Sequence, residues 1–280
     1  MDDMWHGSDL DLDAYLARIG FDGERAPSLA TLRALHRGHT TSLPFENLEP
    51  ALQRPVLLDV PSLQDKLVRS RRGGYCFEHA ALFAAALERL GYDFTALIGR
   101  IMVGAPEGAI RPATHALLLV RPEDDDREWL CDVGFGGGPL EPLEFADGTV
   151  SEQDGWSFRL TRQDDDEFGV RHWALSELGA DGWTRRHVFA QVPAFPIDFA
   201  VASHYVASHP RSPFVGRVFA QRFTAAVHRQ LDNLTLITNW PDGTRETREL
   251  EPGEFGKVLA EFGIVPAAED LEALLELVTA

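Results

Sequence analysis

Residues 71–91, RRGGYCFEHAALFAAALERLG, join a glycine pair and a cysteine to a run rich in alanine and leucine. Gly73 and Gly74 allow the backbone to turn tightly and to approach other groups closely. The run that follows favours a helix and ends at Gly91, a typical C-terminal stop, so the sequence predicts a helix that begins beside Cys76. Cys76 is therefore a packing residue, half of a disulfide, or a nucleophile at a helix N-terminus.

The surroundings of Cys76 favour the nucleophile. Partial positive charge and unpaired N–H groups at a helix N-terminus stabilise a thiolate, and Arg71 and Arg72 add positive charge nearby. The second cysteine is Cys131, and two cysteines in 280 residues form neither a disulfide framework nor a C-x-x-C zinc pair. We therefore predict that Cys76 is the reactive group of an enzyme.

A thiolate nucleophile usually has a histidine within hydrogen-bonding reach and a third group that orients the ring. His115 opens the apolar strand HALLLV, where alternation places it on one face with Leu117 and Leu119. The next apolar run, WLCDVGF, contains Asp132, a carboxylate that is costly to bury without a partner. If the two strands are antiparallel neighbours, Asp132 can hold the His115 ring. Alternation directs Cys131 to the opposite side, where we expect core packing.

Other assignments of these residues stay open. His79 lies on the same face of the predicted helix as Cys76 and is a second candidate base, although no partner for its ring is evident. A metal site formed by Cys76, Glu78, His79 and His115 is a further alternative, but closed zinc sites favour paired cysteines, so we expect no metal. The remaining histidines occur in polar or loop-like sequence, where an exposed or structural role is the default. They are His6, His36, His39, His172, His187, His204, His209 and His228.

The apolar patterns divide the chain into three parts and predict an α+β protein. Residues 1–91 space their apolar side chains three and four apart and predict a helical bundle that carries the cysteine. Residues 92–193 contain short β-rich runs between Gly, Pro and Asp clusters, which predict a small barrel or sandwich that carries the histidine and the aspartate. Residues 194–280 mix strands with helices. By fold analogy, a helix-borne thiol that faces two strands is shared by papain-like and transglutaminase-like proteins.

The composition limits the partners. Lys and Arg total 26 and Asp and Glu total 44, so the net charge is −18, which repels nucleic acid and anionic membranes. No stretch approaches the roughly 18 apolar residues of a membrane span. The opening residues lack the basic start and apolar centre of a secretory signal. We therefore expect a cytoplasmic protein, monomer or dimer, that binds neither nucleic acid nor membrane.

These residues resemble the arylamine N-acetyltransferase family, and the resemblance covers nearly the whole chain. RGG-x-C-x-E at 72–78 followed by DVGFG at 132–136 is its most specific part. The segments TLRALHRGHTTSLPFENLEP, THALLLV and SHYVASHPRSPF also occur in the family's order. The resemblance implies that Cys76 is the acetylated nucleophile, His115 its base and Asp132 the orienting carboxylate. It also implies that residues 1–91, 92–193 and 194–280 form a helical bundle, a β-barrel and an α/β lid.

The same resemblance implies the substrates and their contacts. Phe45, Phe135 and Phe214 would wall the acyl and arylamine pocket, and Tyr205 would lie close to coenzyme A. The expected reaction is ping-pong: the thiolate takes the acetyl group of acetyl-CoA, and an arylamine, a hydrazine or an N-hydroxyarylamine then accepts it. Acetyl-CoA is accordingly a co-substrate, and His115 manages the proton.

Three other functions stay open. A thiol hydrolase or peptidase with the same triad would release an amine from peptides without coenzyme A. An amide synthase of the same family would close a ring on a carrier-bound polyketide. A binding protein with an inactive triad is suggested by Ala80 and Ser203, which stand where the family commonly has asparagine.

Overall fold

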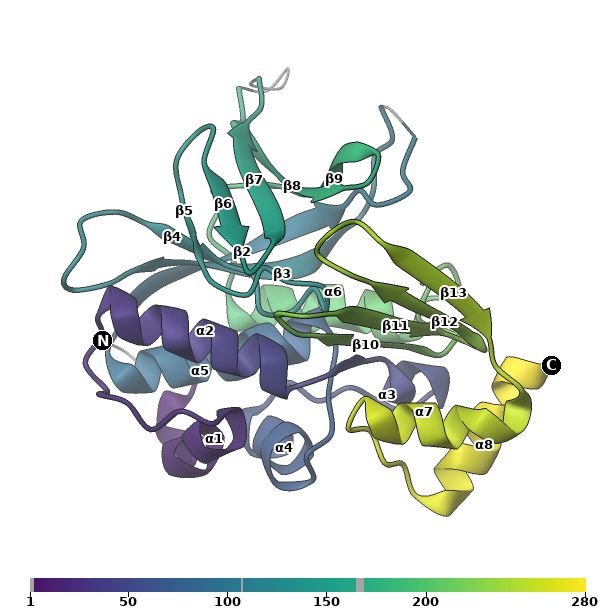
Figure 1. The fold of residues 1–280 in the computed structure, drawn as a ribbon. Helices are drawn as coiled ribbons and strands as arrows, with labels where there is room; N and C mark the ends of the chain where they lie inside the picture. Colours follow the sequence, from purple (N-terminus) through teal and green to yellow (C-terminus); the bar gives the residue numbers. More distant parts are fainter. Residues whose placement is uncertain (1–2, 107, 165–168) are drawn as a thin grey trace.

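Helix α5 (Cys76–Leu90) is buried along nearly its whole length and lies at the centre of the helical part of the molecule (Figure 1). The computed structural model describes residues 3–106, 108–164 and 169–280. As predicted, α5 begins at Cys76, and its C-cap is Gly91, whose φ of 85° lies in the left-handed region that favours glycine. The Tyr75 backbone N–H donates to Glu78 Oε2 (3.1 Å), which fixes the start of the helix.

Further helices pack around α5 and share its hydrophobic core. They are η1 (Gly7–Asp9), α1 (Leu12–Ile19), α2 (Leu29–Ser42), α3 (Leu48–Ala51), α4 (Val60–Leu63) and the π-helical η2 (Gln64–Arg69), which continues α4. Side-chain oxygens of Asp11 and Ser28 accept hydrogen bonds from the backbone N–H groups of Ala14 and Thr31, and so begin α1 and α2. The predicted helical bundle is therefore present, with α5 as its buried member.

An eight-stranded antiparallel sheet packs against the bundle in the order β5-β4-β3-β2-β9-β8-β7-β6 (Figure 1). Its strands are β2 (Asp93–Ile101), β3 (Ala113–Arg121), β4 (Trp129–Cys131), β5 (Leu143–Glu144), β6 (Val150–Gln153), β7 (Trp156–Arg162), β8 (His172–Gly179) and β9 (Gly182–Ala190). Gln153, at the end of β6, exchanges hydrogen bonds with the backbone of Leu140 and Glu141, just before β5. The first and last strands are thereby tied together, and the sheet is a nearly closed barrel.

The two faces of β3 point into two different cores. Ala116, Leu118 and Val120 pack with α5 in the helical core, whereas Leu117 and Leu119 lie inside the barrel. Cys131 belongs to the helical core and is a buried free cysteine, as the alternation predicted. β3 therefore forms the wall between bundle and barrel, and its first residues lie beside the start of α5.

One β-bulge lies between this wall and β2, and a second lies between β9 and β8, further along the sheet. Between β2 and β3 the pairs are Gly99 with His115 and then Arg100 with Ala113, so Thr114 is an extra residue. Between β8 and β9 the pairs are Leu175 with His187 and then Ser176 with Arg185, so Arg186 is an extra residue. A bulge turns side chains that simple alternation would direct elsewhere.

The C-terminal part contains one helix, a second sheet and a terminal helical pair. The sheet has the order β1-β10-β11-β12-β13 and recruits β1, the Phe45–Glu46 pair, from the helical part. The elements are β1 (Phe45–Glu46), α6 (Pro196–Ser208), β10 (Phe219–Phe223), β11 (His228–Asp232), β12 (Thr235–Asn239), β13 (Arg245–Glu249), η3 (Pro252–Glu254), α7 (Phe255–Glu261) and α8 (Ala268–Thr279). The α+β class predicted from the sequence is confirmed, and the division into units at 91 and 193 stays a prediction. In the described part of the chain, every helix is too short or too polar to cross a bilayer.

Packing of α5 against the barrel leads to a prediction on stability. Leu87 is fully buried in α5, and removing its isobutyl group leaves a cavity, so Leu87→Ala should lower the free energy of unfolding by about 2–5 kcal/mol. Leu57→Ala makes the same change at a side chain that is 55% exposed and should stay within about 0.5 kcal/mol of the wild type. Denaturant unfolding measures both, and equal losses would contradict the placement of α5 at the centre of the core.

Candidate active site

Cys76, His115 and Asp132 come together where the start of α5 meets β3 and the end of β4. His115 Nε2 donates to Asp132 Oδ1 at 3.0 Å, and the neighbouring Cys76 also favours the protonated form of the His115 ring. The thiol also donates to the carbonyl oxygen of Thr114 (3.4 Å between sulfur and oxygen). The three side chains are 5%, 2% and 1% exposed, so the group is almost completely withdrawn from water.

The ionised forms of His115 and Asp132 stabilise each other. Burial by itself would lower the pKa of His115, but the Asp132 carboxylate, its hydrogen bond and the contact with Cys76 together raise it to about 10. Burial would raise the pKa of Asp132, but the charge and hydrogen bond of His115 hold it below its ordinary value, with smaller contributions from His187 and Arg186. At neutral pH the pair is thus an imidazolium and a carboxylate, and the ring presents a positive charge and a transferable proton to the sulfur of Cys76.

His36 fixes the backbone that carries the carboxylate. The Asp132 backbone N–H donates to His36 Nε2 (3.2 Å), and His36 Nδ1–H donates to the carbonyl oxygen of Leu140 (3.0 Å). Burial lowers the pKa of His36 to about 4, so the ring is neutral and one of its nitrogens is free to accept. His36 therefore connects α2 to both ends of the segment that follows β4.

The glycines of DVGFGG allow this segment to cross directly over Cys76. A Cβ atom on Gly134 would lie 2.8 Å from the Cα of Cys76, and one on Gly136 would lie 2.8 Å from the Cβ of Phe45. Both distances are shorter than real Cβ contacts, and Gly136 also has a positive φ of 85°. The motif is thus glycine-rich because its backbone touches the thiol-bearing residue and the adjacent β1.

The phenylalanines predicted for the pocket lie around the triad in two groups. Phe135 packs edge-on against the His115 ring, with 5.5 Å between ring centroids. Phe45 and Phe214 contact each other at 5.8 Å, and Phe214 also contacts Tyr75, the residue before the nucleophile. Phe45 is 5% exposed, whereas Phe135 and Phe214 are half-buried. The structure thus brings all three close to Cys76 or its partner.

Tyr205 lies on α6 and packs at the edge of the hydrophobic core that also contains Cys76. Its ring stacks on His209 at 4.5 Å with an interplanar angle of 19°. The same helix carries Ser203, whose hydroxyl exchanges a hydrogen bond with the Tyr75 hydroxyl. α6 is therefore connected to the residue before Cys76, and Tyr205 lies on the helix that makes the connection.

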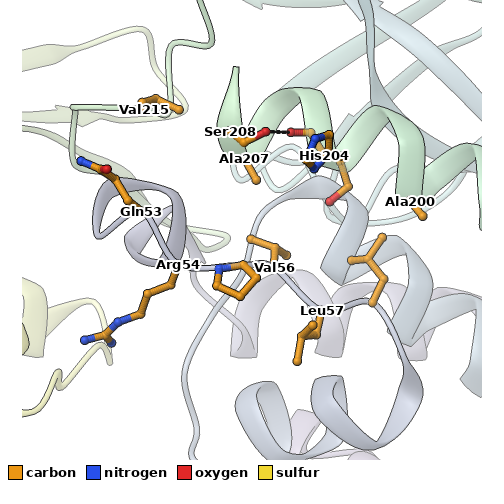
Figure 2. A pocket seen from close by; sticks show the side chains of 12 residues that line it. Gln53, Arg54, Val56, Leu57, Ala200, His204, Ala207, Ser208 and Val215 are labelled. Atoms are coloured by element: carbon orange, nitrogen blue, oxygen red, sulfur yellow. Dashed lines mark hydrogen bonds between the residues drawn. The ribbon is translucent and has the colours of Figure 1, made fainter. Parts of the chain in front are cut away.

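A cavity of about 600 Å³ lies between α6 and the segment 53–58 (Figure 2). Leu57, Ala200 and His204 are among the side chains that line it, and it contains no member of the triad. Arg54 also lines the cavity, and its guanidinium donates a hydrogen bond to the carboxylate of Asp270 on α8. The lining of this cavity is therefore distinct from the group formed by Cys76, His115 and Asp132.

His79, the second candidate base, is engaged elsewhere. Its Nε2 donates to the carbonyl oxygen of Gly74 (3.0 Å), its Nδ1 is paired with His39 Nε2 (2.9 Å), and His39 Nδ1 is paired with the Tyr15 hydroxyl (2.9 Å). Burial lowers the pKa of His79 to about 4, so it stays neutral within this chain of hydrogen bonds. The ring of His79 is therefore occupied by other partners, whereas the ring of His115 lies beside Cys76 and Asp132.

The four-residue metal site considered from the sequence is not assembled, because two of its members have other partners. Glu78 pairs with Lys66 at 2.6 Å, and His79 bonds as described above. Within the described residues, the histidine and carboxylate atoms that do converge belong to His115, Asp132 and His187, with ligand atoms within 4.8 Å of one another.

For four of the remaining histidines the loop-like surroundings expected from the sequence are wrong, while the structural alternative fits their burial. His36, His39, His187 and His228 lie in helices or strands and are buried, not in exposed or loop-like surroundings. For the first two, a signal was present: they continue the apolar spacing of Leu32 and Leu35 along α2, which places all four on one helix face. His187 had no such signal, because the bulge at Arg186 changes the direction of its side chain.

Comparisons with known proteins extend over nearly the whole chain. A family model described as N-acetyltransferase matches residues 28–270. The arylamine N-acetyltransferase of Mycolicibacterium smegmatis is 41% identical over 209 residues, 74% of this chain and 74% of that protein. The solved arylamine N-acetyltransferase of Nocardia farcinica has a TM-score of 0.95 and 54% identity, covering 100% of this chain and 99% of that one. The Mycobacterium marinum arylamine N-acetyltransferase in complex with CoA has a TM-score of 0.88 and 34% identity, covering 96% and 99%.

Removing the charge of Asp132 should lower the reactivity of the Cys76 thiol. In Asp132→Asn the main cause of the raised His115 pKa is lost, so burial keeps that ring neutral at pH 7 and the thiol loses its cationic neighbour. We expect alkylation of Cys76 by iodoacetamide at pH 7 to slow at least tenfold. Acetyl transfer should fall about 10²–10⁴-fold, as when other triads lose this carboxylate. Asp126→Asn, at an exposed carboxylate, is the matched control.

The same variant should also change how the free energy of unfolding depends on pH. Because the pKa of His115 is raised in the folded protein from 6.5 to about 10, its protonation stabilises the fold fully below pH 6.5, and this contribution is lost as pH rises through 10. The free energy of unfolding of the wild type should therefore decrease between pH 7 and 10, and more steeply than that of Asp132→Asn. Parallel curves would contradict the ionised pair.

Proposed function

The chain belongs to the arylamine N-acetyltransferase family, and we propose that it transfers the acetyl group of acetyl-CoA to aromatic amines, hydrazines or N-hydroxyarylamines through a thioester on Cys76. It is an acyltransferase, and acetyl-CoA is its co-substrate. The observation that supports the proposal most strongly is the ionised pair of His115 and Asp132 beside a buried thiol at a helix N-terminus. That arrangement supplies a thiolate and a place for its proton in one dry site.

The proposed reaction has two half-reactions that share Cys76 and His115. The thiolate attacks the thioester carbonyl of acetyl-CoA, the carbon–sulfur bond to the coenzyme breaks, and the departing thiolate takes the proton from the His115 imidazolium. The acceptor amine then attacks the Cys76 thioester, and neutral His115 takes its proton as the bond to Cys76 breaks. The imidazolium and the thiolate are thereby restored. Asp132 stays ionised throughout and stabilises the charged ring.

The withdrawal of the triad from water suits a thioester intermediate. Because Cys76 is only 5% exposed, a bound acyl group meets little water and can wait for a weakly basic amine. We propose that Phe45, Phe135 and Phe214 line the acceptor pocket and select flat aromatic molecules by area and shape. Their packing around His115 and Tyr75 supports this role.

We propose Tyr205 as a coenzyme contact. It lies on α6, two residues after Ser203, through which the helix is joined to Tyr75 beside Cys76. The solved structure from M. marinum contains CoA, which supports a coenzyme site in a protein of this fold. We also propose that the enzyme is cytoplasmic and a monomer or dimer, and that it acts on small molecules. Nucleic acid is not a proposed partner, because the net charge of −18 repels it.

The alternatives from the sequence are not favoured. The relatives and structures described above are named as acetyltransferases, not as amide synthases or thiol hydrolases. The paired His115 and Asp132 also argue against an inactive triad, because a binding protein has no use for a buried ion pair that is costly to assemble.

Incubation with acetyl-CoA alone tests the thioester. Intact-mass spectrometry should find one acetyl group on the wild type and none on Cys76→Ala. Cys131→Ala should be acetylated like the wild type, because Cys131 is buried in the helical core and burial raises the pKa of its thiol. Adding an arylamine or a hydrazine should then remove the label. A wild-type protein that stays unmodified, or that releases amines from peptides without coenzyme A, would refute the proposal.

The acceptor pocket is tested by truncating one wall. Phe214→Ala removes an aromatic face next to Tyr75, so KM for an arylamine should rise about 5- to 50-fold while acetylation by acetyl-CoA changes less. Phe21→Ala, at another half-buried phenylalanine in the loop after α1, is the control and should keep the wild-type KM. If both half-reactions fell equally in Phe214→Ala, a role in acceptor recognition would be excluded.

A further inference from the structure

His187 is a buried histidine beside the triad that the reaction described above does not use. Its side chain has no exposed surface, and neither ring nitrogen has a hydrogen-bond partner among the residues that the structure describes. Asp132 Oδ2, the carboxylate oxygen that does not bond His115, is also buried and without a hydrogen-bond partner in the described part of the chain. His187 Nε2 and Asp132 Oδ2 lie 3.7 Å apart. Unpaired buried polar atoms are costly, so two of them facing each other in an active site need an explanation.

The bulge in β9 brings His187 to this position. Because Arg186 is an extra residue in the strand, Arg186 and His187 are both buried although they are neighbours, and they point to the same region. The Arg186 guanidinium lies 3.7 Å from the centroid of the Phe135 ring and donates to the carbonyl oxygen of Gly137 (2.6 Å). Arg186 thus supports the glycine-rich segment after β4, while His187 is left facing the carboxylate.

The neighbours of the His187 ring determine its orientation and its charge. It packs between His115, at 4.8 Å between ring centroids, and Phe189, at 6.0 Å, with Phe135 at 5.8 Å. Burial lowers the pKa of His187 to about 3, the charge of Asp132 opposes this shift, and the charges of His115 and Arg186 add to it. The ring is therefore neutral and carries a single N–H, which is best placed on Nε2, opposite a carboxylate that can only accept.

We propose that His187 is a positioning residue whose Nε2–H holds the second oxygen of Asp132, so that the first oxygen stays on His115. The present separation of 3.7 Å exceeds an ordinary N–H···O distance by about 0.5–1.0 Å, so forming the bond requires the ring to move toward the carboxylate. A carboxylate bonded at one oxygen only can rotate about its last torsion, which is broad for aspartate. Held at both oxygens, it keeps the His115 ring in line with the thiol. This inference rests on the proposed function, because it assumes that His115 serves Cys76.

Two variants at position 187 and one control test the inference. His187→Phe keeps a ring of similar size but removes both nitrogens, and His187→Gln keeps an N–H donor. Trp173→Phe is the matched control, because Trp173 Nε1 is another buried nitrogen without a hydrogen-bond partner in the described barrel, and it belongs to the core around Phe189 rather than to the triad. For each protein the measurements are kcat/KM for acetyl-CoA, the pH profile of iodoacetamide alkylation at Cys76, and the melting temperature.

We expect His187→Phe to lose about 10- to 100-fold in kcat/KM and to shift the alkylation profile, because a misplaced triad costs about this much. Its melting temperature should change little, since the hydrogen bond lost to Asp132 is offset by the burial of an apolar ring in place of a polar one. His187→Gln should recover most of the activity. Trp173→Phe should match the wild type in kcat/KM and in the alkylation profile. The inference is overturned if His187→Phe keeps both the wild-type rate and profile, or if its activity falls only together with its melting temperature and His187→Gln is no better.

The same experiment separates this inference from the function on which it rests. Cys76→Ala, measured in parallel, must lose acetyl transfer if the proposed nucleophile is correct. If Cys76→Ala were as active as the wild type, the function itself would be wrong. If Cys76→Ala is inactive and His187→Phe is fully active, the function stands and only the role of His187 fails.

Discussion

The buried ion pair between His115 and Asp132 is the interaction on which the site depends. Neither charge is stable alone in a place that is 1–2% exposed, since burial favours the neutral form of both groups. Together they keep an imidazolium next to the Cys76 thiol at neutral pH. The sulfur, which comes from a different element, needs only to be brought to the free side of the ring. The fold around the pair serves to place these three groups and to exclude water from them.

That placement occurs at a junction between two cores. β3 separates the helical core from the interior of the barrel, and its first residues lie at the start of α5, so the thiol arrives from one core and the ring from the other. Close approach at this junction requires the backbone itself to touch. Gly134 supplies this contact against Cys76, and Gly136 supplies it against Phe45 on β1. A side chain at either glycine would push the segment after β4 away from the nucleophile.

Neutral histidines support the charged one. His36 holds the backbone of Asp132, and the chain from Tyr15 through His39 to His79 ends on the carbonyl oxygen of Gly74, two residues before Cys76. Burial keeps each of these rings uncharged, so each can donate at one nitrogen and accept at the other without adding a charge beside the pair. The site therefore has one charged histidine, and the neutral rings fix the backbone at Asp132 and at Gly74 without competing for its proton.

The sequence by itself determined the parts of this protein that depend on neighbouring residues. The glycine pair and the capped, alanine-rich run determined that Cys76 begins a helix, and the period of two in β3 and β4 placed His115 and Asp132 on one side and Cys131 on the other. The tertiary structure alone decided which distant segments meet. It decided the pairing of β1 with β10, the contacts of Gly134 and Gly136, the bonds that withdraw His79 from the thiol, and the bulge that turns His187 toward Asp132. The physical reason is that periodicity encodes how a segment folds and which face it buries. A one-residue bulge or a contact between backbones arises only when two segments, far apart in the chain, pack against each other.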